Sequence, residues 1–172
     1  MKKSILFLAS LLVLATSCYE DYVRDFDYSG ALMAYQYDLR TFVLDEGEQF
    51  KVTVALTGVM QNEVDRNVEL ILEPTLLEGS LANLTNSALT SGEYVAKEIK
   101  AANLTQMTLL PDSYYTVEGQ SGLCIKKGTH TASVTLRATE DMRNDPKAFA
   151  PYYALGFKIA SADVDQIVEG KD

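Results

Sequence analysis

The sequence predicts an all-β fold, an immunoglobulin-like β-sandwich of about seven strands with one short helix, behind a lipoprotein signal peptide. Three observations predict it: short runs of alternating apolar and polar residues, glycine-containing turns between those runs, and an apolar leader that ends at a cysteine. The chain has 172 residues, and removing the first 17 leaves 155, about the size of one domain.

The leader consists of the basic residues Lys2 and Lys3 and an apolar stretch over 5–15. This stretch is shorter than the roughly 20 residues that a bilayer-spanning helix needs. We therefore expect residues 1–17 to be a cleaved signal peptide.

The end of the leader, Leu-Ala-Thr-Ser-Cys over 14–18, resembles a bacterial lipobox. We expect Cys18 to become the acylated N-terminus and to anchor the protein to a membrane. The alternative is an ordinary secretory signal that is cut near this cysteine. Glu20 and Asp21 resemble the signal that exports Bacteroidetes lipoproteins to the outer face of the outer membrane. We expect a lipidated tether over 18–30 and surface exposure of the domain over 31–172.

Alternation of apolar and polar residues locates the strands, because successive side chains of a strand point to opposite sheet faces. The clearest runs lie at 50–56, 68–72, 134–136 and 155–159, and weaker ones at 34–37, 42–44, 115–117 and 123–126. Turn residues separate them at 45–47, 119–122 and 127–128. A helix is expected over 91–102, where Val95 and Ile99 are four residues apart.

Several segments resemble the Bacteroidetes domain of unknown function 1735 family. They are Leu-Leu-Pro-Asp-Ser-Tyr-Tyr over 109–115, Ile-Lys-Lys-Gly over 125–128, the tyrosine-containing segment 151–159, and 168–172. The resemblance implies an immunoglobulin-like N-terminal module of surface proteins, encoded beside polysaccharide-utilisation machinery. It carries over no catalytic or ligand residue. Family members usually continue into a closing strand after the last segment, so two alternatives stay open: the last strand is missing here, or this member is unusually short. A missing last strand would leave a sheet edge open.

The charge excludes several classes of partner. The formal net charge is −9 and becomes −11 when the leader takes Lys2 and Lys3 away. Such an acidic chain repels phosphate backbones, which argues against nucleic-acid binding, and it has no basic patch for anionic membranes.

Few residues offer catalytic chemistry, and we expect no enzyme, cofactor or metal. His130 is the only histidine, which excludes a two-histidine zinc site, and the sequence has no Gly-x-Ser-x-Gly motif, which makes a hydrolase triad hard to assemble. We expect His130 to face solvent in a turn. The acidic run 140–145 has oxygen ligands for calcium but lacks a calcium loop's spacing, and we expect it to be a solvated loop. Cys124, between two apolar residues, is expected to be buried and inert.

Carbohydrate binding is the remaining chemistry, since sugars stack on aromatic rings. The chain has 10 tyrosines and no tryptophan. Tyr114 and Tyr152 each belong to an adjacent tyrosine pair, in which alternation is expected to turn one ring inward and one outward. We take Tyr114 and Tyr152 as candidate glycan contacts. The alternative is that these rings only pack the core and neighbouring strands.

Two functions follow as expectations. The first is a non-catalytic outer-membrane surface lipoprotein module that acts as scaffold, spacer or weak glycan binder in polysaccharide capture. Its expected partners are glycans or other outer-membrane uptake proteins. The second is a structural or adhesive lipoprotein whose sheet edge accepts a strand from a partner, as in fimbrial assembly.

Overall fold

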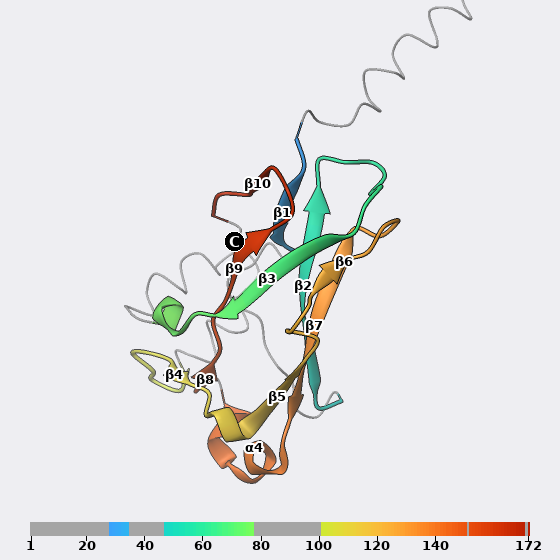
Figure 1. Ribbon diagram of the computed structural model, residues 1–172. Helices are drawn as coiled ribbons and strands as arrows, with labels where there is room; N and C mark the ends of the chain where they lie inside the picture. Colours follow the sequence, from blue (N-terminus) through green and yellow to red (C-terminus); the bar gives the residue numbers. More distant parts are fainter. Residues whose placement is uncertain (1–27, 35–46, 78–100, 151, 171) are drawn as a thin grey trace, which may run out of the picture.

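The computed structural model describes residues 28–34, 47–77, 101–150, 152–170 and 172 (Figure 1). The leader, Cys18, Glu20 and Asp21 lie outside the described residues, as do the expected strand 42–44 and most of the expected helix. The described residues form an all-β sandwich, as the alternating pattern predicts. None of their helices is both long enough and apolar enough to cross a bilayer.

One layer is a five-stranded sheet in the order β10-β1-β2-β7-β5. Its strands are β1 (Gly30–Met33), β2 (Gln49–Thr57), β5 (Tyr115–Glu118), β7 (Thr131–Ala138) and β10 (Gln166–Ile167). β10 pairs parallel to β1, and the other pairs are antiparallel. Alternation determines the central register, because Val52 of β2 lies opposite Val134 of β7 and both side chains enter the core.

The second layer is a three-stranded sheet. β3 (Arg66–Leu72) lies between β6 (Cys124–Ile125) and β9 (Phe157–Ala162), and both pairs are antiparallel. The buried residues of the two layers form one core, as the apolar sets of the sequence predict. They are Ala31, Val52, Val54, Leu56, Val68, Leu70, Leu123, Ile125, Val134, Leu136 and Ile159.

Short elements gather at one end of the sandwich. The parallel pair β4 (Thr108–Leu109) and β8 (Tyr153–Ala154) lies there with helix α4 (Glu140–Asn144) and the 3₁₀ turns η4 (Asp112–Tyr114) and η5 (Pro146–Phe149) (Figure 1). A further 3₁₀ turn, η2 (Pro74–Leu77), follows β3. The end that carries α4 will be called the helical end.

The opposite end holds the start of β1. Gly30 pairs with Thr57, the last residue of β2, whereas the first residue of β2, Gln49, pairs with Arg137 just before α4. Eight steps along β2 at about 3.3 Å each separate the two ends by roughly 26 Å. The end at which β1 begins will be called the N-terminal end.

Three sequence expectations need correction. The strand expected at 34–37 falls, apart from its first residue, outside the described residues, and a strand that was not expected lies just before it, at Gly30–Met33, paired with β2. The strand expected at 155–159 begins only at Phe157, because Gly156 packs against Glu73, whose carbonyl oxygen would lie 2.4 Å from an added Cβ. The acidic run is no loop, because Thr139 caps it as helix α4.

Candidate functional site

The helical end is shaped by two caps in succession. Thr139 has an extended backbone and its hydroxyl accepts from the Met142 backbone N–H at 3.5 Å, which begins α4 where β7 ends. Asp145 ends α4 and begins η5, and its carboxylate accepts from the Lys147 backbone N–H at 2.9 Å. Pro146 follows as the first residue of η5, the position that proline favours. These caps hold the Asp145 carboxylate in a defined place.

Two tyrosines meet at this carboxylate, and a third packs on one of them. The Tyr153 hydroxyl donates to Asp145 Oδ2 at 2.7 Å, and the Tyr114 hydroxyl donates to the same oxygen at 3.1 Å. The Tyr153 ring lies edge-to-face with that of Tyr114 (5.7 Å between centroids) and with that of Tyr152 (4.9 Å). Edge-to-face packing is a favoured geometry of aromatic pairs. Tyr114, Tyr152, Tyr153, Asp145 and Lys147 will be called the tyrosine cluster.

Lys147 adds a cation to the cluster. Its ammonium lies over the Tyr152 ring, 4.9 Å from the centroid, within the range of a cation–π contact. The Lys147 side chain is exposed and the Tyr152 ring is half-buried. The cluster therefore presents an aromatic ring and a positive charge to solvent.

The shared carboxylate changes the acidity of its neighbours. The hydrogen bond to Asp145, then desolvation, raises the pKa of Tyr153 well above its ordinary value. Desolvation, then the bond to Asp145, raises the pKa of Tyr114. The Lys147 backbone N–H, then the Tyr153 hydroxyl, lowers the pKa of Asp145. At neutral pH the carboxylate is ionised and both phenols are protonated, which is the state that the hydrogen bonds require.

The cluster rests on a small apolar core of its own. Leu110 and Met142 are each 5% exposed, and Tyr114 and Tyr153 pack against them. Tyr114 and Tyr153 thus pack on this small core, and the Tyr152 ring packs on that of Tyr153. The Lys147 ammonium lies over one face of the Tyr152 ring and can donate hydrogen bonds to a polar ligand.

The structure brings the two candidate tyrosines together through Tyr153. The expectation of one inward and one outward ring in each pair is wrong, since all four rings of the two pairs are half-buried. Tyr114 ends a 3₁₀ turn and Tyr152 precedes β8, so neither pair lies wholly in a strand. Sequence reasoning considered Asp145 only as part of the acidic run 140–145 and missed its contacts with the tyrosines, and it did not consider Lys147, although Asp-Pro is a recognisable start signal for a helical turn.

The other residues considered from the sequence form no reactive site. Cys124 is half-buried, not buried, because the strand turns its neighbours Leu123 and Ile125 into the core and Cys124 to the other face. His130 does not face solvent fully, since its Nε2 lies 3.2 Å from the Val59 carbonyl oxygen. The described residues contain no group of histidine, cysteine and carboxylate side chains suited to a metal ion.

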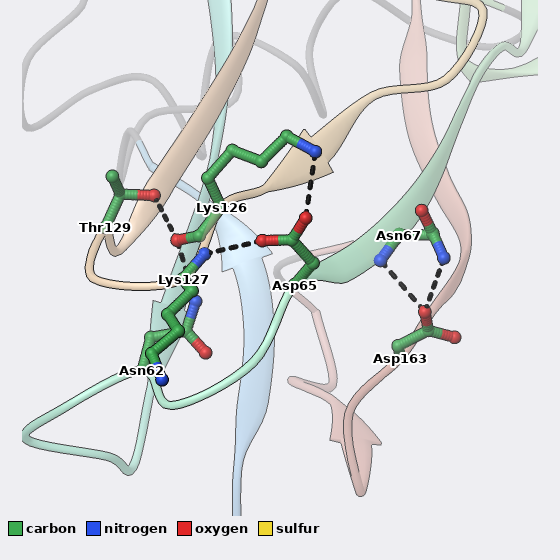
Figure 2. A network of polar contacts seen from close by, with 7 residues as sticks. All are labelled: Asn62, Asp65, Asn67, Lys126, Lys127, Thr129 and Asp163. Carbon is green, nitrogen blue, oxygen red and sulfur yellow. Dashed lines mark hydrogen bonds and ion pairs between the residues drawn. The ribbon is translucent and has the colours of Figure 1, made fainter.

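A second polar cluster lies at the N-terminal end (Figure 2). Asp65 accepts from the Lys126 ammonium at 2.9 Å and from the Lys127 backbone N–H at 2.8 Å. Asp163 accepts from both the backbone and the side-chain amide of Asn67, each at 2.9 Å. These bonds join chain segments to one another, which is a structural role.

Comparisons with known proteins place the chain in a family without assigning a function. No curated protein matches it. A solved structure from Bacteroides ovatus, titled as a structural-genomics protein of unknown function, superposes with a TM-score of 0.60 at 20% sequence identity. The match covers 84% of this chain and 44% of that one, so this chain spans less than half of that protein. A family model described as "-like, N-terminal domain" matches residues 22–166, and the chain belongs to this family of N-terminal domains.

Proposed function

We propose that the protein is a non-catalytic surface lipoprotein module that serves polysaccharide capture as a scaffold or spacer and binds glycans weakly through the tyrosine cluster. The observation that carries this proposal is the Tyr152 ring with the Lys147 ammonium 4.9 Å from its centroid, held on Tyr153 and Asp145. The resemblance to the domain of unknown function 1735 family and the lipobox-like leader support the location and the context.

The position of the cluster fits this role. If Cys18 carries the lipid, the N-terminal end is the tethered end of the sandwich, and the helical end lies at the far side from it. A binding surface for extracellular glycans belongs at the end away from the membrane.

Affinity electrophoresis in gels that contain soluble neutral polysaccharides tests the binding. Tyr152→Ala is expected to weaken binding about tenfold, equivalent to about 1.4 kcal/mol. Tyr28→Ala is the matched control, because Tyr28 is an exposed tyrosine (45%) at the opposite end. Equal retardation of the parent protein and both variants by every polysaccharide would refute glycan binding by the cluster.

The intact mass of the protein extracted from the outer-membrane fraction tests the anchor. We expect a chain that begins at Cys18 and carries acyl groups. An unacylated mass would refute the lipoprotein proposal. The proposal of glycan binding would not be affected, because affinity electrophoresis tests it separately.

One observation favours a second candidate function, strand exchange with a partner. Within the described part of the chain, β9 pairs with β3 and has no strand on its other side. Exposed edges accept added strands. Concentration-dependent polymers in analytical ultracentrifugation would support this adhesive role, whereas a monomer at all concentrations would refute it.

A further inference from the structure

Exposed apolar side chains at the N-terminal end fit a role that the proposed glycan binding does not use. Met60 is 54% exposed and Val64 is 52% exposed, and both lie on the connection between β2 and β3. Tyr28, 45% exposed, lies at the same end, because its carbonyl oxygen would be 2.1 Å from a Cβ added at Gly58. Exposed large apolar side chains also occur at the helical end, at Leu109 and Phe149. The position of the proposed lipid tether, and not exposure alone, therefore decides which end faces a membrane.

The connection that carries Met60 and Val64 is held firmly. Asn62, between them in the sequence, is only 2% exposed. Its side-chain amide donates to the Lys126 carbonyl oxygen at 3.0 Å, and its own carbonyl oxygen accepts from the Gly128 backbone N–H at 2.8 Å. The two apolar side chains therefore project from an ordered loop, and little ordering cost remains on binding.

Charges at this end are nearly balanced, unlike those of the chain as a whole. The Lys126 ammonium lies 2.9 Å from Asp65 (Figure 2). The Lys127 ammonium lies 3.7 Å from Glu63. With Arg66, Asp163 and Asp165, which lie at the same end, the named groups amount to three cations and four carboxylates. A strongly acidic surface would be repelled by an anionic bilayer, but this end is only weakly acidic.

The chain length places this end near a membrane. Cys18 precedes Tyr28 by ten residues, which span at most about 36 Å when fully extended. We infer that Tyr28, Met60 and Val64 rest on the interfacial region of the lipid bilayer and so turn the tyrosine cluster away from it. The inference rests on the proposed acylation of Cys18.

The absence of tryptophan from the sequence permits a direct test. A single tryptophan is introduced as Val64→Trp at the N-terminal end, or as Phe149→Trp at the helical end, where Phe149 is 59% exposed. The full lipidated chain is reconstituted into phosphatidylcholine–phosphatidylglycerol vesicles, with and without lipids brominated near the headgroup. We expect Val64→Trp to lose roughly half of its emission in brominated vesicles, because interfacial side chains enter about 5–10 Å into the bilayer, and Phe149→Trp to lose none.

Three outcomes overturn the inference. An unquenched Val64→Trp protein whose mass shows acyl groups would refute contact with the bilayer and leave the proposed lipoprotein intact. Equal quenching at both positions would refute the orientation. An unacylated mass would refute the anchor and the inference together. Met60→Trp repeats the measurement if circular dichroism shows that Val64→Trp has lost its β-structure.

Discussion

The two ends of the sandwich are each organised around an aspartate, but the partners of the two carboxylates differ. At the N-terminal end, one Asp165 oxygen accepts from the backbone N–H and the hydroxyl of Ser29, at 2.7 and 2.8 Å. At the helical end, Asp145 accepts from two tyrosine hydroxyls and from the Lys147 backbone N–H. Small polar groups surround the first carboxylate, and aromatic rings surround the second.

The difference supports the proposal that the N-terminal end serves mainly the fold and that the helical end serves binding. Asp165 follows β9 and ties it to the residue before β1, 136 positions earlier in the chain. Its neighbours are polar groups that bond to one another, among them Arg66, which donates to Asn62 at 3.1 Å. At the helical end the tyrosine hydroxyls are bonded, but the Tyr152 ring and Lys147 still reach solvent. Substitutions should therefore affect folding most at the first end and binding most at the second.

The largest expected effect is that of Gly58→Ala at the N-terminal end. Gly58 has a φ of +84°, and an added Cβ would lie 2.1 Å from the Tyr28 carbonyl oxygen. The free energy of unfolding should fall by more than about 3 kcal/mol, because backbone atoms must move in addition to the φ strain. Urea denaturation measures this.

Gly122→Ala is the matched control for this substitution. Its φ is +80°, but an added Cβ would meet nothing within 4 Å. It should cost only about 1 kcal/mol, the strain of a positive φ. Equal losses in the two variants would contradict the claim that the Tyr28 segment packs closely on Gly58.

Asn62→Ala should have the next largest effect. It removes the donor to the Lys126 carbonyl oxygen and the acceptor of the Arg66 guanidinium from a side chain that is 2% exposed. We expect a loss of about 2 kcal/mol in the free energy of unfolding, with the binding of polysaccharides unchanged in affinity electrophoresis. A loss below about 0.5 kcal/mol would show that the polar cluster does not hold this end together.

The helical end should respond to pH through Asp145. Because the pKa of Asp145 is lowered in the fold, its stabilising contribution is present above its ordinary pKa of 3.8 and is lost as the pH falls below it. The raised pKa of Tyr153 makes its contribution present below about pH 10 and lost at higher pH. Asp145→Asn should lower the urea midpoint at neutral pH, and the gap from the parent should narrow toward pH 3.

The control for the pH prediction is Glu169→Gln, an exposed carboxylate far along the sequence from the cluster. Its urea midpoint should follow that of the parent at every pH. If the difference in urea midpoint between Asp145→Asn and the parent stays constant from neutral to acid pH, the charge of the Asp145 carboxylate does not stabilise the tyrosine cluster.

The smallest effect on stability is expected for Lys147→Met. The ammonium over Tyr152 is exposed, and contacts of this kind contribute roughly 0.5 kcal/mol. Binding of polysaccharides should nevertheless weaken, because the ammonium that lies over the Tyr152 ring can no longer donate hydrogen bonds to sugar hydroxyls. A variant that loses stability but not binding would reverse the assignment of the helical end to recognition.

Much of the fold could be predicted from the sequence because strand alternation is a local property. Val52, Val54 and Leu56 enter the core as their spacing predicts, and so do Val134 and Leu136. The prediction was wrong where other contacts dominate. Thr139 caps the acidic run into a helix, and Gly156 leaves the strand pattern to pack against Glu73.

The candidate site could be predicted only in part. Tyr114 and Tyr152 were chosen from their adjacent tyrosine pairs, and the structure places both beside Tyr153. Asp145, the carboxylate that joins Tyr114 and Tyr153, is 31 positions from Tyr114, and no local pattern indicates that contact.

The sequence by itself determined the all-β class and the core faces of the main strands, because the two-residue period of a strand can be recognised within a few neighbouring residues. Only the tertiary structure decided which residues meet at each end of the sandwich. The pairing of β2 with β7 carries Thr139 and α4 to one end, and the pairing of β1 with β2 carries Tyr28 to the other. These meetings depend on pairings between distant segments, so their register decides which side chains become neighbours.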